Sequence, residues 1–191
     1  MTRLPAGAAC LTLVLACSRS PAPSAAPAPP TAPPTALVAA QVEPAHGPAF
    51  LADDWDEAQR RALANGTLLF VDAWAPWFHT CWSMRRDVLH DASLSSFADR
   101  VTFVEIDTDR PHNAAFLARY PVRGWPTFFA IDPSSGAMLA LQAGSMSLAE
   151  TIAFLDRALA LRTSTAPADL ALAAGYRALQ SGDARAAASR F

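Results

Sequence analysis

Apolar residues follow two different spacings through the middle of the chain, and their alternation predicts an α/β fold. Four consecutive apolar residues at 68–71 predict a strand over 67–73 that is covered on both faces. A second apolar run predicts a strand over 101–106. Two more, over 127–131 and 137–142, flank an Asp-Pro-Ser-Ser-Gly turn, which is typical of a hairpin.

Helices are predicted between these strands. The first opens at Asp53-Asp54-Trp55-Asp56, where acidic side chains lie at the positive end of the helix dipole, and ends at Asn65-Gly66. The helices that follow are expected over 82–89, from near Asp91, and from Pro111 to Tyr120. A last helix opens at a capping box between Ser147 and Glu150. Its apolar face comprises Leu148, Ile152, Leu155 and Leu159.

Residues 1–17 are predicted to be a lipoprotein signal peptide. Arg3 precedes an apolar run from Ala6 to Ala16, whose eleven positions match a signal-peptide core and are too few to span a bilayer. The ending Val14-Leu15-Ala16-Cys17 resembles a bacterial lipobox, which implies that Cys17 is acylated and anchors the protein to a membrane. The alternative is a plain secretory peptide cut near Ala16. By resemblance to known lipoproteins, Ser18 after the cysteine implies a periplasm-facing protein of the outer membrane.

The flanks of the globular region differ in composition from it. Residues 18–48 are rich in Pro and Ala and cannot bury enough apolar surface to offset their ordering entropy, so they are predicted to form a disordered tether. Residues 163–191 begin with a linker and then resemble a partial tetratricopeptide repeat. Such a segment could continue into further repeats, pack on the domain or stay mobile. A single Ala-rich amphipathic helix is the alternative.

Chemistry-bearing residues gather where the buried strand runs into a helix. The stretch Val71-Asp72-Ala73-Trp74-Ala75-Pro76-Trp77-Phe78-His79-Thr80-Cys81 resembles the thioredoxin superfamily, whose site is Trp-Cys-x-x-Cys after a strand with a buried Asp. Trp77 matches the motif's Trp, Cys81 its second cysteine and Asp72 the buried acid, whereas Phe78 stands in place of the nucleophilic cysteine. His79-Thr80 resembles the periplasmic DsbD C-terminal type.

The resemblance covers the predicted domain at 50–162. It implies a thioredoxin fold, with a central mixed sheet flanked by helices, here without the optional first edge strand. A second marker is Val122-Arg123-Gly124-Trp125-Pro126-Thr127, which resembles the loop that carries a cis proline beside the active-site helix. The resemblance therefore implies a cis bond between Trp125 and Pro126, and a groove there in which a protein or thiol partner docks.

Whether the chain is an enzyme depends on Phe78. Thiol-disulfide exchange needs an accessible thiolate and a second thiol that resolves the mixed disulfide. The family activity is thiol-disulfide oxidoreduction, but after signal removal only Cys81 and the acylated Cys17 remain, so no disulfide can form within one chain. We expect no cofactor. The net charge of −2 gives no indication of a nucleic-acid partner.

Three functional alternatives remain open for this site. The domain could be a noncatalytic binding module whose groove is lined by Trp77, Phe78, Trp82 and Trp125 with Pro126. Cys81 could instead act alone as a monothiol, which requires access and a lowered pKa. A metal held by Cys81 and His79 is the third alternative.

The same residues lead to two expectations about burial. Core packing should take Trp74 and at least one of the four groove aromatics. The Asp72 carboxyl should have a raised pKa, because its neighbours are apolar.

Overall fold

The computed structural model describes residues 46–190. The predicted signal peptide with Cys17, and all of the predicted tether except its last three residues, lie outside the described residues. No helix among the described residues is long and apolar enough to cross a bilayer.

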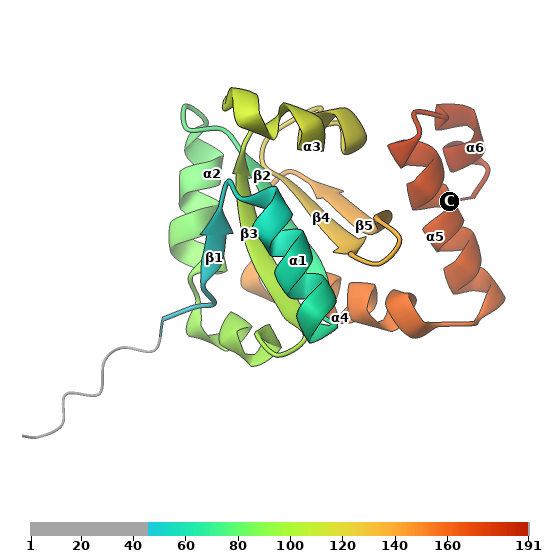
Figure 1. The fold of residues 1–191 in the computed structure, drawn as a ribbon, viewed down its shortest axis with the longest axis horizontal. Coiled ribbons are helices and arrows are strands. Elements are labelled where there is room, and N and C mark those ends of the chain that lie inside the picture. The colour runs from blue at the N-terminus through green and yellow to red at the C-terminus, as the bar shows by residue number, and fades with distance from the viewer. Residues whose placement is uncertain (1–45, 191) are drawn as a thin grey trace, which may run out of the picture. The chain divides into compact units, whose positions relative to one another are not determined.

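A five-stranded mixed sheet forms the centre of the domain, in the order β1-β3-β2-β4-β5 (Figure 1). Strands β1 and β2 run parallel to β3, whereas β4 runs antiparallel to both β2 and β5. The strands are β1 (Phe50–Ala52), β2 (Leu68–Trp74), β3 (Val101–Asp107), β4 (Thr127–Asp132) and β5 (Ala137–Ala143). The predicted central mixed sheet is confirmed.

The expectation that the domain lacks a first edge strand is wrong. Phe50 pairs with Phe103 and Ala52 with Glu105, so β1 extends the sheet beyond β3. Only three residues pair, which is too short a segment to show a period of two along the sequence. The strand forms because the buried edge of β3 offers it backbone partners.

Helices cover both faces of the sheet (Figure 1). Helices α1 (Trp55–Asn65) and α3 (Ala114–Arg119) pack on the core cluster that contains Val71 and Phe129. Helices α2 (His79–Met84) and α4 (Leu148–Thr163) pack on the cluster that contains Phe70 and Phe128. The sheet is therefore buried between two helical layers.

The helix ends follow the predicted capping residues closely. Asp54 accepts the backbone N–H of Glu57 at the start of α1, and Gly66 ends that helix with a positive φ of 66°. The helix that was expected at 82–89 begins three residues earlier, at His79, and continues as a π-helical turn over Arg85–Leu89. Short 3-10 segments over Ala92–Phe97 and Pro111–Asn113 lie near the positions predicted from Asp91 and Pro111.

The C-terminal segment folds as two helices, α5 (Pro167–Gln180) and α6 (Ala184–Ala188), so the single-helix alternative is wrong. Gly182, with φ of 79°, makes the turn between them. The side-chain amide of Gln180 accepts the Met138 N–H and donates to the Gly136 carbonyl, each at 3.1 Å. The segment therefore packs on the domain at β5, while its relation to tetratricopeptide repeats stays a prediction.

The capping box of α4 provides a stability test. Ser147 Oγ accepts the Glu150 N–H at 3.3 Å, and the Glu150 carboxylate accepts the Ser147 N–H at 2.7 Å. Ser147→Ala removes the hydroxyl that accepts the Glu150 N–H, while the Ser147 N–H keeps its Glu150 acceptor, and should lower the free energy of unfolding by about 1 kcal/mol. Thermal denaturation measures this loss. Ser145→Ala, in the same exposed loop, is the control and should change it by less than about 0.5 kcal/mol.

Candidate functional site

The end of β2 carries the central residues of the candidate site. All seven residues of β2 are buried, and the chain leaves the sheet through Ala75 and Pro76. Phe78 takes the N-cap position of α2, where its side chain makes no capping hydrogen bond. Cys81 therefore lies in the first turn of α2, and its N–H donates to the Phe78 carbonyl at 3.0 Å.

The Asp72 carboxyl is buried, with 1% of the residue exposed. Neither of its oxygens has a hydrogen-bond partner among residues 46–190. Burial raises the pKa of Asp72 to about 7, with the Arg85 charge opposing the increase and the Glu105 charge adding to it. The prediction of a raised pKa is confirmed, so near neutral pH this side chain exchanges between an acid and a carboxylate.

An ion pair beside Asp72 was missed by sequence reasoning. Glu105 lies opposite Asp72 in the register of β2 and β3, and its carboxylate pairs with the Arg85 guanidinium at 2.5 Å. Arg85 also lies 4.3 Å from the centroid of the Trp74 ring, a cation–π distance. Both charged side chains are less than one-fifth exposed. The only sequence signal was the position of Arg85, one helical turn after Cys81.

Cys81 is fully buried. Burial raises the pKa of its thiol, and the nearby Asp72 carboxylate adds to that increase, while a hydrogen bond at the Ala75 backbone and the Arg85 charge oppose it. Asp72 and Cys81, which the sequence singled out separately, therefore lie close enough to interact electrostatically. The thiol nevertheless lacks both exposure and a lowered pKa, which an attacking sulfur requires.

The expected cis peptide bond between Trp125 and Pro126 is confirmed. Trp77, Phe78 and Trp125 lie together at this bond and form what we call the aromatic patch. The Trp77 ring centroid lies 4.9 Å from that of Trp125 and 5.9 Å from that of Phe78. The indole N–H of Trp77 donates to Asp109 at 2.7 Å, and that of Trp125 donates to Thr108 Oγ1 at 2.8 Å. The loop after β3 thus holds both indoles in place.

Two expectations about these aromatic residues are wrong. Trp82 does not share the patch: its ring contacts Trp74 at 5.4 Å, and its indole N–H donates to the Pro76 carbonyl. In addition, the core takes none of the four residues, since Trp77 is 55% exposed, Trp82 50% exposed, and Phe78 and Trp125 partly buried. Trp74 is buried as expected. Trp82 packs against Trp74 and Arg85 instead.

The two polar residues between Phe78 and Cys81 do not build a metal site. His79 is exposed and Thr80 half-buried, whereas Cys81 is buried. The His79 imidazole and the Cys81 thiol are therefore not accessible from the same side to one metal ion. Among residues 46–190, no group of three or more His, Cys, Asp or Glu side chains has a metal-binding arrangement.

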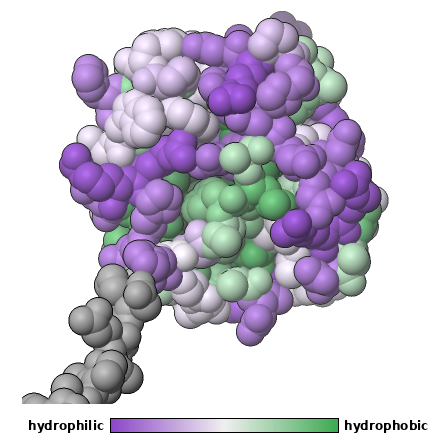
Figure 2. All heavy atoms as spheres, turned by 60° about the vertical axis from the view of Figure 1, so that its left-hand side comes forward, coloured by the Kyte–Doolittle hydropathy of each residue, from purple (hydrophilic) through white to green (hydrophobic). Residues whose placement is uncertain are grey.

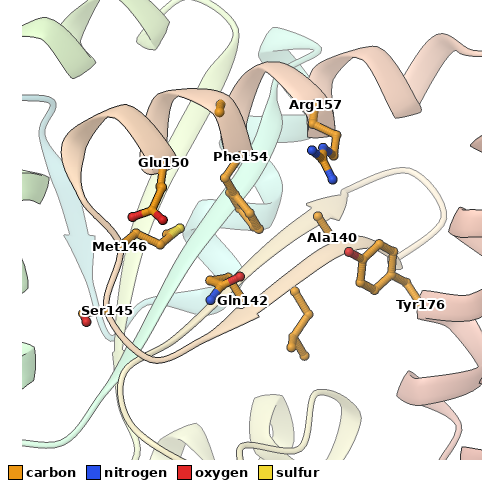
Figure 3. A pocket seen from close by; sticks show the side chains of 10 residues that line it. Ala140, Gln142, Ser145, Met146, Glu150, Phe154, Arg157 and Tyr176 are labelled. Carbon is orange, nitrogen blue, oxygen red and sulfur yellow. The ribbon is translucent and has the colours of Figure 1, made fainter. Parts of the chain in front are cut away.

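Apolar surface and a further pocket also occur on the domain. Figure 2, which brings the α2 side of Figure 1 forward, shows an apolar patch surrounded by hydrophilic residues. A pocket of about 240 Å³ lies between α4, β5 and α5, and Figure 3 shows Phe154 and Arg157 reaching into it from α4, with Tyr176 coming from α5. None of the site residues lines this pocket. Exposure alone therefore does not single out the aromatic patch, but its position beside Pro126 and α2 does.

Comparisons with known proteins identify the fold. Residues 49–133 match the model of a thioredoxin-like family. A comparison with curated proteins found no match. A solved thioredoxin from Thermus thermophilus is 26% identical with a TM-score of 0.51, over 58% of this chain and 87% of that one. A DsbH oxidoreductase is 22% identical with a TM-score of 0.52, over 64% of this chain and 92% of that one.

The C-terminal domain of DsbD from Neisseria meningitidis is also similar, at 18% identity and a TM-score of 0.47, over 57% of this chain and 98% of that one. Together with the sheet order and the cis proline, the family match shows that the domain has a thioredoxin fold. This fold resembles that of thiol-disulfide oxidoreductases. The boundaries 50–162 stay a prediction.

The raised pKa of Asp72 predicts a pH-dependent stability. The folded chain holds this proton up to about pH 7, whereas the unfolded chain releases it near the ordinary pKa of an Asp side chain, 3.8. Stability should therefore fall as the pH rises from about 4 to 7, by up to about 4 kcal/mol from this group alone. Asp72→Asn cannot ionise, so its stability relative to the unchanged protein should increase over that window.

Chemical denaturation at a series of pH values measures this difference. The control is Asp99→Asn, because Asp99 is exposed. A difference between Asp72→Asn and the unchanged protein that stays constant from pH 4 to 8 would contradict the burial of an ionisable Asp72.

Proposed function

We propose that this thioredoxin-like domain is a redox-inactive recognition module that binds an extended polypeptide at the aromatic patch. The observation that carries the proposal is the complete burial of Cys81 next to an α2 N-cap occupied by Phe78. Dithiol exchange needs a thiolate at the exposed start of this helix and a second thiol to resolve the mixed disulfide. Phe78 supplies neither of them.

The aromatic patch has the chemistry of a protein-binding surface. Trp77 is more than half exposed although its indole N–H is bound to Asp109, so its apolar ring surface is open while its polar atom is satisfied. Rigid, partly exposed Trp side chains supply much of the binding energy in protein interfaces. The second Trp of the patch is fixed in the same way by Thr108. A partner would thus bury apolar surface without breaking these hydrogen bonds.

A second candidate function is monothiol chemistry at Cys81. It is favoured by the Asp72 carboxyl, which is coupled to the thiol, has no hydrogen-bond partner among the described residues and has a pKa of about 7. Such a group can accept the thiol proton at neutral pH. This chemistry requires an opening of the loop at Pro76–Phe78 that exposes the sulfur. The Cys81 thiolate would then attack a disulfide of the partner, forming a mixed disulfide and releasing the partner's other sulfur as a thiolate.

For the rest of the chain, we propose a periplasm-facing lipoprotein of the outer membrane, anchored through Cys17. The lipobox-like ending of residues 1–17 supports this, and the Pro/Ala-rich composition of 18–48 supports a tether between anchor and domain. The tetratricopeptide-like pattern of 163–191 supports a role in protein assembly. The partner is a protein, and the balance of charges does not favour nucleic acid.

Thiol labelling distinguishes the two candidate functions. In protein without residues 1–45, Cys81 is the only cysteine, and it should react with a small aromatic disulfide reagent only after denaturation, because the native sulfur is buried. Phe78→Cys should label rapidly in the native state and gain the ability to reduce insulin. Rapid native labelling of Cys81 itself, with a midpoint below about pH 8.5, would favour the monothiol function.

Binding at the aromatic patch is tested with an extended polypeptide that has no free thiol. Reduced and S-alkylated insulin B chain should shift the indole N–H resonances of Trp77 and Trp125. Trp77→Ala should weaken this binding by about fivefold or more, since a truncated interface Trp typically costs at least about 1 kcal/mol. Trp82→Ala is the matched control, because Trp82 is similarly exposed but lies outside the patch. Equal losses for both variants would contradict the proposed surface.

A further inference from the structure

A second pocket lies between the sheet and the C-terminal helices. It encloses about 290 Å³, and its walls come from three parts of the fold: the loop after α3, the strands β4 and β5, and the turn between α5 and α6. Phe129, Met138 and Leu141 line it from the sheet, and Leu179 lines it from α5. None of the residues of the aromatic patch, nor Asp72 or Cys81, lines this pocket.

The uncharged polar side chains of the pocket are already hydrogen-bonded within the protein. The Tyr120 hydroxyl donates to the Gly136 carbonyl at 2.9 Å, and the Thr127 hydroxyl donates to the Gly124 carbonyl at 2.7 Å. Gln180 uses both ends of its amide on the edge of β5. A ligand therefore meets walls that behave as apolar surface, with few free donors or acceptors to satisfy.

Arg123 is the only charged side chain that lines this pocket. It is exposed, and it makes no ion pair or hydrogen bond with the part of the chain that the structure describes. An apolar cavity with a single free guanidinium suits a ligand with an apolar body and one anionic end, because a carboxylate can bind this fork with two charge-assisted hydrogen bonds. Leu179, still 37% exposed, would be covered by the apolar body.

The pocket of Figure 3 differs in this respect. Glu150 and Arg157 both line it, so it presents an acidic and a basic side chain together, and its wall includes the polar side chains of Ser145 and Gln142. A ligand with one negative charge would be attracted by Arg157 and repelled by Glu150, so this pocket does not favour it. The comparison between the two pockets thus gives a control site within the same molecule.

We propose that the pocket at Arg123 and Leu179 binds an unbranched aliphatic monocarboxylate of about ten non-hydrogen atoms. The size follows from the volume of about 290 Å³, at about 30 Å³ for each group of the size of a water molecule. The carboxylate binds Arg123 and the chain lies against Leu141 and Leu179. This site is independent of the proposed function, because the aromatic patch contributes nothing to it.

The test uses the full chain and octanoate, a carboxylate of this size, with octan-1-ol as the uncharged match, both below the concentration at which they aggregate. Titration calorimetry and backbone NMR shifts should show octanoate bound at the turn between α5 and α6, with a dissociation constant of about 1 mM or lower. Arg123→Gln should weaken octanoate by about tenfold and leave octan-1-ol unchanged. Arg157→Gln, in the pocket of Figure 3, should change neither.

A second pair of variants tests the apolar wall. Leu179→Asp should weaken both octanoate and octan-1-ol, whereas Leu170→Asp, on the same helix but outside the pocket, should affect neither. The proposal is overturned if octanoate does not bind, if Arg123→Gln leaves its affinity unchanged, or if the shifts map to the aromatic patch. It is also overturned if N-acetyl-leucine binds more tightly than octanoate, since the occupant would then be a peptide C-terminus.

Discussion

The complete burial of β2 is the constraint on which the rest of the domain depends. This strand lies at the centre of the sheet, between β3 and β4, with helices packed on both faces. Every side chain it carries should therefore be apolar or satisfied, yet neither the Asp72 carboxyl nor the Trp74 indole N–H has a hydrogen-bond partner among residues 46–190. An unpartnered buried carboxyl costs free energy of folding at any pH, and more once it ionises. The structure limits that cost by raising the pKa of the group, which keeps it protonated up to about neutral pH.

The same burial determines what α2 can do. The helix starts where β2 ends, so its first turn lies partly inside the molecule, and Cys81 is enclosed there while Phe78 and Trp77 lie further out. Arg85 crosses from the next turn to Glu105 on β3 and lies over Trp74. The buried acid, the thiol and the ion pair are thus one electrostatic unit. The residues that reach solvent are aromatic, which favours recognition over sulfur chemistry.

The C-terminal helices pack at the edge of the sheet that β5 forms. An edge strand such as β5 leaves backbone groups without partners. The side-chain amide of Gln180 accepts one of them, the Met138 N–H, and donates to the Gly136 carbonyl in the turn before the strand. By packing there, α5 and the turn that follows it also close one wall of the pocket at Arg123. The aromatic patch and this pocket use different residues and different chemistry. The domain therefore offers two surfaces that can be altered independently.

Local signals in the sequence were sufficient for most of the secondary structure. Asp54, Gly66 and Ser147 act on backbone groups within four residues, so the ends of α1 and the start of α4 could be located from the chain alone. The apolar neighbours of Asp72 were enough to predict its burial, and a resemblance in the loop at Pro126 was enough to expect the cis bond.

Contacts between residues distant in the sequence were decided only by the tertiary structure. The strand β1 depends on β3, about fifty residues away, and the pairing of Arg85 with Glu105 depends on the register of β2 and β3. Likewise, packing against Trp74 and Arg85, and not the spacing along α2, separated Trp82 from the aromatic patch. Spacing along one helix or strand determines which residues share a face. It does not determine what lies against that face, because that depends on how the elements pack.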